Sequence, residues 1–146
     1  MKHLKNFKII ALAFLLSVSI SQPTSAIKQI EKVSIEGKNR YETAIQISKK
    51  SYPKTSDTAI IVNPEKIADS LSVGVLAHQI NSPILLTDHD EINQSTLREI
   101  QRLKAKNIIL VGGTQSISKS QETNLINQGY KVRRIYGKDR IDTSFA

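Results

Sequence analysis

The acidic run Asp88–Glu91 is the part of the sequence whose residue types come closest to a metal or catalytic site. It holds three carboxylates and His89, and it follows an apolar run of strand character. Carboxylates two residues apart after a strand can chelate a hard cation such as Mg²⁺ or Ca²⁺. No further acid or histidine is obviously placed to complete the ligand set. A polar loop before the next helix is therefore the favoured interpretation, and no metal site is predicted.

Other residue patterns that could support catalysis are also incomplete. Gly112–Thr114 could cradle a phosphate, but the glycine and lysine spacing of nucleotide-binding loops is missing, so a tight turn is favoured. No serine lies in a G-x-S-x-G sequence, and the chain has no cysteine. The lack of cysteine excludes thiolate nucleophiles, thiolate metal sites and disulfide-rich scaffolds. The sequence predicts no catalytic residue and no cofactor.

Two arginines stand where a helix is expected to begin. Arg40 follows Lys38, and Arg140 follows Lys138 in the same way. A guanidinium group can bind phosphate or carboxylate oxygens with two hydrogen bonds, and a helix N-terminus adds backbone donors. The alternative is an arginine paired with an acid such as Asp69, which would hold the module's geometry. The residues leave both interpretations open.

Five short apolar runs alternate with four stretches of helical period, and these elements must position the cations and loops. Three of the runs are apolar at every position, which is typical of strands covered by helices on both faces of a parallel sheet. The last run alternates with basic residues and is predicted to be an edge strand. The pattern predicts an α/β, Rossmann-like layered fold with a mostly parallel sheet of about five strands. The runs are Val33–Ile35, Ala59–Val62, Pro83–Leu86, Ile108–Val111 and Tyr130–Ile135.

Local signals mark where three of the helices begin and where one ends. Each start combines a capping residue with Glu or Gln three positions later, as in a capping box. Gly129 is expected to end the last helix, because glycine readily adopts the backbone conformation that follows a helix end. The three predicted pairs are Asn39 with Glu42, Thr96 with Glu99, and Ser118 with Gln121.

An internal repeat relates two segments at an offset of 100 residues, Ser34–Ala44 and Arg134–Ser144. Five positions are identical, and two more are conservative replacements. The segment that opens the first helix thus returns near the end of the chain. The simplest interpretation is one complete module of about 100 residues, followed by the start of a second.

The first 26 residues have the three-part pattern of a secretory signal peptide. Lysines precede the apolar run Ile9–Ile20, and Thr24–Ala26 supplies small residues before a cleavage point. The apolar run has 12 residues, and a membrane-spanning helix needs about 20. We expect a secreted chain of residues 27–146 without a membrane segment. Loss of three lysines leaves 18 basic and 13 acidic residues and lowers the net charge from +8 to +5. That modest charge, with no aromatic and basic stacking platform, argues against nucleic acid as a partner.

Five blocks of the sequence, in their order and spacing, resemble the type 2 cell-wall-binding repeat family. The resemblance implies a Rossmann-like module that usually occurs in three tandem copies packed around a pseudo-threefold axis. Such modules attach exported proteins of Gram-positive bacteria to an anionic cell-wall polymer. This chain departs from the pattern at Ser70, Ile141 and Ser144, and it contains one module instead of three. The matching blocks are Gly37–Ala44, Asp69–Leu71, Ser82–Thr87, Ile108–Gly113 with Ile117–Ser118, and Arg134–Arg140.

From the resemblance we expect a non-enzymatic module at residues 27–133, a truncated second repeat at residues 134–146, and a location at the cell wall or cell surface. The expected partners are a teichoic-acid-like anionic polymer and either a homotrimer or other repeat modules. Physical reasoning makes Pro83–Leu86 a buried strand, with the binding site just beyond it. The rival interpretations are a fragment of a longer protein without function of its own and, less favoured, a small wall hydrolase. The ligand-binding residues implied are Lys38, Arg40, Tyr41, Asp69, Pro83, Ile84, Leu85, Leu86, Thr87 and Arg140.

Overall fold

The computed structural model describes residues 32–136, apart from the side chains of residues 67–72. The predicted signal peptide, the second repeat from Gly137 onward and Arg140 lie outside the described residues, as does the side chain of Asp69. All helices and strands described belong to one compact unit that begins at Ser34.

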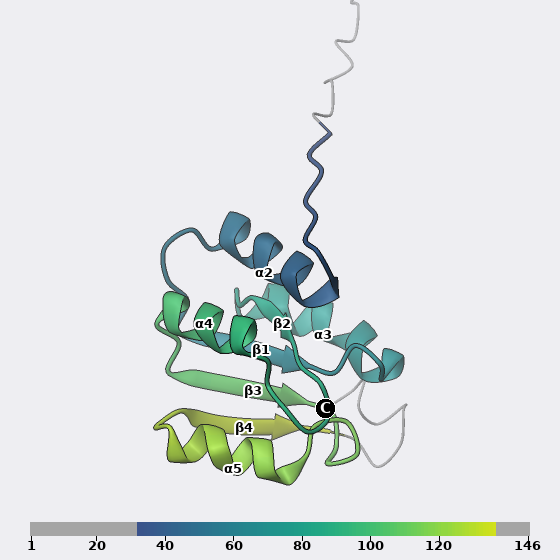
Figure 1. Cartoon of the computed structure of the whole chain (residues 1–146), viewed down its shortest axis with the longest axis vertical. Coiled ribbons are helices and arrows are strands. Elements are labelled where there is room, and N and C mark those ends of the chain that lie inside the picture. The colour runs from purple at the N-terminus through teal and green to yellow at the C-terminus, as the bar shows by residue number, and fades with distance from the viewer. Residues whose placement is uncertain (1–31, 137–146) are drawn as a thin grey trace, which may run out of the picture. The chain divides into compact units, whose positions relative to one another are not determined.

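Helices and strands alternate along this unit (Figure 1). The α/β fold predicted from the sequence is confirmed, and each predicted helix is present. In chain order the elements are α2 (Arg40–Ser51), β1 (Thr58–Val62), α3 (Ile67–Gln79), β2 (Ile84–Leu86), α4 (Gln94–Leu103), β3 (Asn107–Val111), α5 (Lys119–Asn127) and β4 (Lys131–Ile135).

The four strands form one parallel sheet in the order β2-β1-β3-β4. The prediction that the last apolar run is an edge strand is confirmed, because β4 pairs with β3 alone. The prediction of a first strand at Val33–Ile35 is wrong, since this segment adopts no strand conformation. A strand is stable only when a neighbour satisfies its backbone N–H and C=O groups, and apolar residues alone do not supply one. The strand β4 extends to Ile135, so the first two residues of the second repeat copy belong to this sheet.

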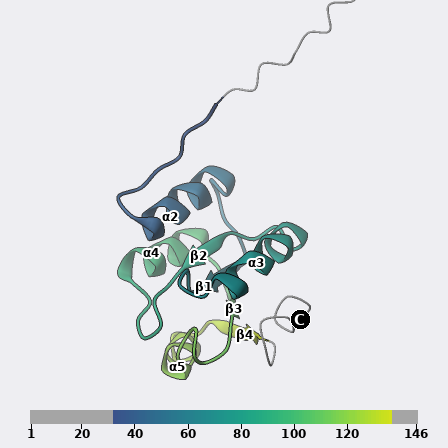
Figure 2. The ribbon, with the colours of Figure 1, turned by 90° about the vertical axis from the view of Figure 1, so that its right-hand side faces the viewer.

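Helices cover both faces of the sheet, which explains why the central strands are apolar at every position. On one face Ile61 and Leu110, in register on β1 and β3, pack with side chains of α2, α4 and α5. On the other face Ile60 and Val62 pack against Val73 and neighbouring side chains of α3. Figure 2 shows α4 and α3 on opposite sides of the strands.

The repeated segment around Gly37 builds the N-terminus of α2. The side chain of Asn39 accepts a hydrogen bond from the backbone N–H of Glu42 at 2.9 Å, so the predicted cap is confirmed. The Gly37 N–H donates to Thr43 Oγ1 at 3.0 Å, and that hydroxyl donates to the Asn39 carbonyl at 3.0 Å. A Cβ on Gly37 would lie 2.5 Å from the backbone nitrogen of Thr43. Glycine is required here because the chain folds back onto the first helical turn.

The other two predicted capping boxes are wrong. Asn93, three residues before Thr96, caps α4 by accepting from the Thr96 N–H at 3.1 Å. Ser118 is the cap residue of α5 but makes no side-chain capping bond. The side chain of Gln121 is instead turned into the loop that follows β2. Gly129, with φ of +91°, follows the end of α5 as predicted.

Candidate functional site

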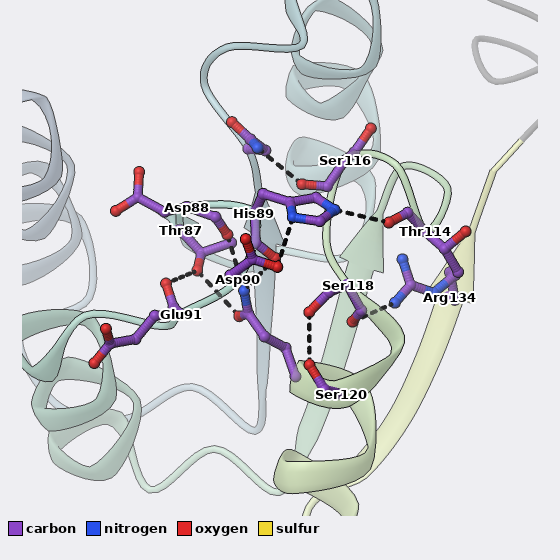
Figure 3. Close-up of polar contacts among 12 residues, drawn as sticks. Thr87, Asp88, His89, Asp90, Glu91, Thr114, Ser116, Ser118, Ser120 and Arg134 are labelled. Carbon is purple, nitrogen blue, oxygen red and sulfur yellow. Dashed lines mark hydrogen bonds and ion pairs between the residues drawn. The ribbon is translucent and has the colours of Figure 1, made fainter.

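The carboxyl ends of the strands bring three loops together, residues 63–66, 87–93 and 112–118. In open α/β sheets, ligands bind at this edge, where the strand order reverses. Here that position lies between β1 and β3, because the chain passes from β1 out to β2 and then returns to β3. Figure 3 shows the side chains of these loops and their hydrogen bonds.

Thr87, the residue expected to border the ligand, is fully buried at the end of β2. Its N–H donates to the Val62 carbonyl at 3.1 Å. Its hydroxyl lies within hydrogen-bonding distance of the Glu91 carbonyl (3.1 Å) and of Gln121 Oε1 (3.3 Å). The Gln121 amide in turn donates to the carbonyls of Asp88 (3.0 Å) and His89 (2.6 Å). The polar groups of Thr87 therefore hold the loop in place.

His89 joins the loop after β2 to the loop after β3. Its Nδ1 lies 2.7 Å from Asp90 Oδ1, and its Nε2 lies 3.1 Å from the Thr114 carbonyl oxygen (Figure 3). Its carbonyl also accepts from the Ser118 N–H at 2.9 Å. The side chains of His89 and Asp90 are thus engaged in loop contacts. Among the described residues, no three side chains of His, Asp or Glu gather as metal ligands.

Asn63 joins the loop after β1 to the loop after β3. Its amide donates to the Ser116 carbonyl at 2.8 Å, and its Oδ1 accepts from the Glu65 N–H at 2.9 Å. The side chain is 3% exposed, so the polar groups at the strand reversal are satisfied within the protein.

Arg134 points inward from β4, although its neighbours Lys131 and Arg133 are exposed. Its guanidinium donates to the carbonyl of Gly112 at 2.9 Å and to Glu122 Oε2 at 2.9 Å. The glycine turn after β3 therefore presents its carbonyls to an arginine of the same chain. Burial alone would raise the pKa of Glu122. Hydrogen bonds from Lys119 and Arg134, and the charges of both, outweigh that effect and hold the pKa below its usual value.

The opening of α2 meets the same edge of the sheet. Tyr41 is half-buried and donates a hydrogen bond from its phenol to the carboxylate of Asp88. Lys38 and Arg40 are exposed on either side of the Asn39 cap. None of the described residues forms an ion pair with Arg40.

The residues Pro83–Leu86 divide between core and groove. Pro83 and Leu85 are buried, and Ile84 and Leu86 are half-buried beneath α3, as expected of a core strand. Pro83 and Ile84 also line an apolar groove of about 400 Å³ between α2 and α3, at the amino end of β2. The structure thus brings Arg40 and Tyr41 to the Thr87 end of this strand, away from Pro83.

Sequence reasoning did not identify Asn63, Gln121 or Arg134 as organisers of the loops. The signals were weak: a polar residue directly after a strand, a glutamine in the first turn of a helix, and a basic residue on an alternating strand.

The sheet order and the helices on both of its faces define a doubly wound, Rossmann-like α/β module. The chain belongs to the family Cell wall binding domain 2 (CWB2), which matches residues 34–122. The family predicted from the sequence is confirmed.

Two proteins of Bacillus subtilis (strain 168) are related in sequence. The N-acetylmuramoyl-L-alanine amidase LytC is 35% identical over 137 residues, which cover 94% of this chain and 27% of the amidase. The Amidase enhancer is 40% identical over 104 residues, which cover 71% of this chain and 14% of the enhancer. Among solved structures, Cwp8 from Clostridium difficile superposes with a TM-score of 0.72 at 35% identity over 76% of this chain. Cwp6 from the same organism gives 0.68 at 33% identity over 82% of this chain.

The chain spans 27% or less of the length of each of these relatives. Family membership and these relatives indicate attachment to the cell wall and a location at the wall or cell surface. None of the helices in residues 32–136 is long and apolar enough to cross a membrane.

Proposed function

We propose that this chain binds an anionic glycopolymer of the cell wall, of the teichoic-acid type, without catalysing a reaction. The observation that carries the proposal is membership of a cell-wall-binding family over residues 34–122, in a chain whose net charge is +5 after the predicted signal peptide is removed. Cations attract a polymer that carries repeated negative charges, and this attraction weakens as salt screens it.

The site predicted from the sequence supplies one contact for such a polymer. Arg40 is exposed at the first position of α2, with Lys38 exposed two residues earlier. A guanidinium there can bind a phosphate or carboxylate with two hydrogen bonds. Tyr41 and Thr87 serve this site indirectly, because Tyr41 ties the opening of α2 to the loop after β2 and Thr87 holds that loop at the end of β2.

We further propose that useful retention on the wall needs several modules, either in a homotrimer of this chain or with other repeat modules. Linked sites on a repetitive polymer gain from effective concentration, so the avidity can exceed the affinity of one module by ~100-fold or more. Light scattering on the sample used for binding assays measures the association directly. A strictly monomeric protein with tight wall binding would contradict this part of the proposal.

The test of the main proposal is co-sedimentation with Bacillus subtilis walls before and after chemical removal of their anionic polymer. We expect binding to intact walls that falls with rising salt and is lost on stripped walls. Arg40→Gln should weaken binding, and His89→Ala, which removes a loop contact without removing a surface arginine, serves as the comparison. Equal binding to stripped and intact walls would refute the anionic polymer as ligand.

A further inference from the structure

Among the described residues, the charged residues of the loops between α2 and β4 are segregated between the two edges of the sheet. The carboxyl-edge loops, residues 63–66, 87–93 and 112–118, carry four acids and one lysine: Glu65, Asp88, Asp90, Glu91 and Lys66. The loops that lead into the strands at the opposite, amino edge carry the reverse. Residues 52–57, 80–83, 104–106 and 128–130, together with the first residue of β4, hold four lysines and one acid: Lys54, Lys104, Lys106, Lys131 and Asp57.

The three carboxyl-edge loops therefore repel a polyanion, and the cations Lys38 and Arg40 meet this edge from the opening of α2. A polyanion is attracted by the amino edge, which lies at the left of the sheet in Figure 1. We name the four lysines Lys54, Lys104, Lys106 and Lys131 the lysine edge. All four are exposed, and none of the ion pairs found among residues 32–136 involves them.

Hydrogen bonds to backbone carbonyls hold the lysine edge together. The Lys131 N–H donates to the Lys106 carbonyl at 2.9 Å, which sets the entries to β4 and β3 side by side. The Lys106 N–H donates to the Asp57 carbonyl at 2.9 Å, and this joins the loop before β1. Arg102 Nη1 donates to the Lys54 carbonyl at 3.2 Å, which fastens that loop to the last turn of α4. The four lysines thus lie on segments that hydrogen bonds join along the amino edge of the sheet.

Helix polarity accounts for only part of this arrangement. Helices end at the amino edge, and a cation stabilises the negative end of a helix dipole within about one turn. Lys104 is the cap residue that ends α4, so its charge has this structural explanation. Lys54 lies three residues beyond α2, and Lys106 and Lys131 lie at the entries to strands. Lysine also protects an edge strand such as β4 from aggregation, but Lys106 precedes β3, which is an inner strand.

We infer that the lysine edge is a polyanion-contact surface of this module, separate from Arg40 and at the opposite edge of the sheet. This inference rests on the proposed function, since the polyanion is the anionic wall polymer. Neighbouring lysines with few acids among them form a positive field that attracts a chain of repeated negative groups. Binding there needs no enclosed pocket, because each ammonium group contacts the polymer as a point charge.

The test measures wall affinity of the full chain by co-sedimentation at several salt concentrations. The double variant Lys106→Gln/Lys131→Gln removes two charges of the lysine edge. Lys119→Gln is the comparison for loss of one exposed lysine charge elsewhere: Lys119 lies at the start of α5, near the carboxyl edge, and is paired with Glu122. One cation at an anionic surface contributes roughly a fivefold change in affinity. We expect the double variant to lose about twentyfold, with a shallower dependence on salt, and Lys119→Gln to change little.

Lys106→Arg/Lys131→Arg keeps both charges and should bind as the unchanged chain does. Thermal unfolding of all variants identifies any loss of fold. This inference is overturned, and the proposed function stands, if the unchanged chain binds polymer-bearing walls and the double glutamine variant binds them equally well. The same conclusion follows if each charge removed in the double variant lowers the affinity no more than Lys119→Gln does. If the unchanged chain does not distinguish stripped from intact walls, both are overturned.

Discussion

The phenol of Tyr41 donates a hydrogen bond to the carboxylate of Asp88, 47 residues further along the chain. This contact joins the first turn of α2 to the loop after β2, beside the exposed Arg40. The hydrogen bond to Asp88, burial, and the negative charge of Asp88 raise the pKa of Tyr41 from 10.0 to about 12. The positive charge of Arg40 opposes this rise in pKa, and the negative charge of Glu65 adds to it. Charges on α2 and on the loop after β1 therefore both act on the Tyr41 phenol.

The first prediction concerns this pair at high pH. Because the pKa of Tyr41 is raised on folding, neutral Tyr41 stabilises the folded chain fully below pH 10, and this contribution is lost as the pH rises from 10 towards 12. Absorbance of tyrosinate at 295 nm measures the titration. Tyr41→Phe should remove a component that titrates near pH 12.

Asp88→Asn is the companion variant for this titration. It keeps a hydrogen-bond acceptor but removes the negative charge, so the Tyr41 component should move to lower pH. A titration curve that Asp88→Asn leaves unchanged would contradict the assignment.

The second prediction concerns the buried carboxylate between α2 and α4. Glu99, whose side chain is 1% exposed, accepts from Ser48 Oγ at 2.7 Å and from two nitrogens of Arg102 at 2.8 Å each. Arg102→Ala leaves this charge buried and unpaired, and we expect a loss of about 3 kcal/mol in the free energy of unfolding. Urea unfolding measures the change.

Arg98→Ala is the matched control on the same helix. Arg98 is exposed, and its Nε donates to the Gln94 carbonyl at 3.2 Å. Substitution at such a surface position changes stability by about 0.5 kcal/mol or less. Equal urea midpoints for the two variants would show that the Glu99 pair contributes nothing to stability.

The third prediction compares two glycines. Gly37→Ala places a Cβ 2.5 Å from the backbone nitrogen of Thr43, so the first turn of α2 must shift at a cost of about 1–3 kcal/mol. Gly74→Ala in α3 meets no atom within 4 Å and should stabilise by roughly 0.5–1 kcal/mol, because glycine is entropically unfavourable in a helix. Thermal melts of both variants provide the comparison. Stabilisation by Gly37→Ala would mean that the chain does not fold back onto α2 as described.

The sequence by itself determined the helices, the four strands of the sheet (β1 to β4) and the family. Helix periodicity, apolar runs, the Asn39 cap and the Gly129 stop depend on neighbouring residues, so they are visible without the tertiary fold. The order of several motifs along the chain identified the family for the same reason. Local signals failed where a competing local partner existed, as at Thr96, which Asn93 caps.

Only the tertiary structure decided which loop residues meet. Asn63 bonds to Ser116, and Arg134 turns inward to Gly112, because the strand order β2-β1-β3-β4 places these distant segments together. The tertiary structure also decided that Val33–Ile35 is not a strand. A strand needs a neighbouring strand to pair with, and an apolar run alone does not show that one is present. The separation of acidic and basic loops follows from the same geometry: parallel strands joined by helices send every second loop to the same edge of the sheet.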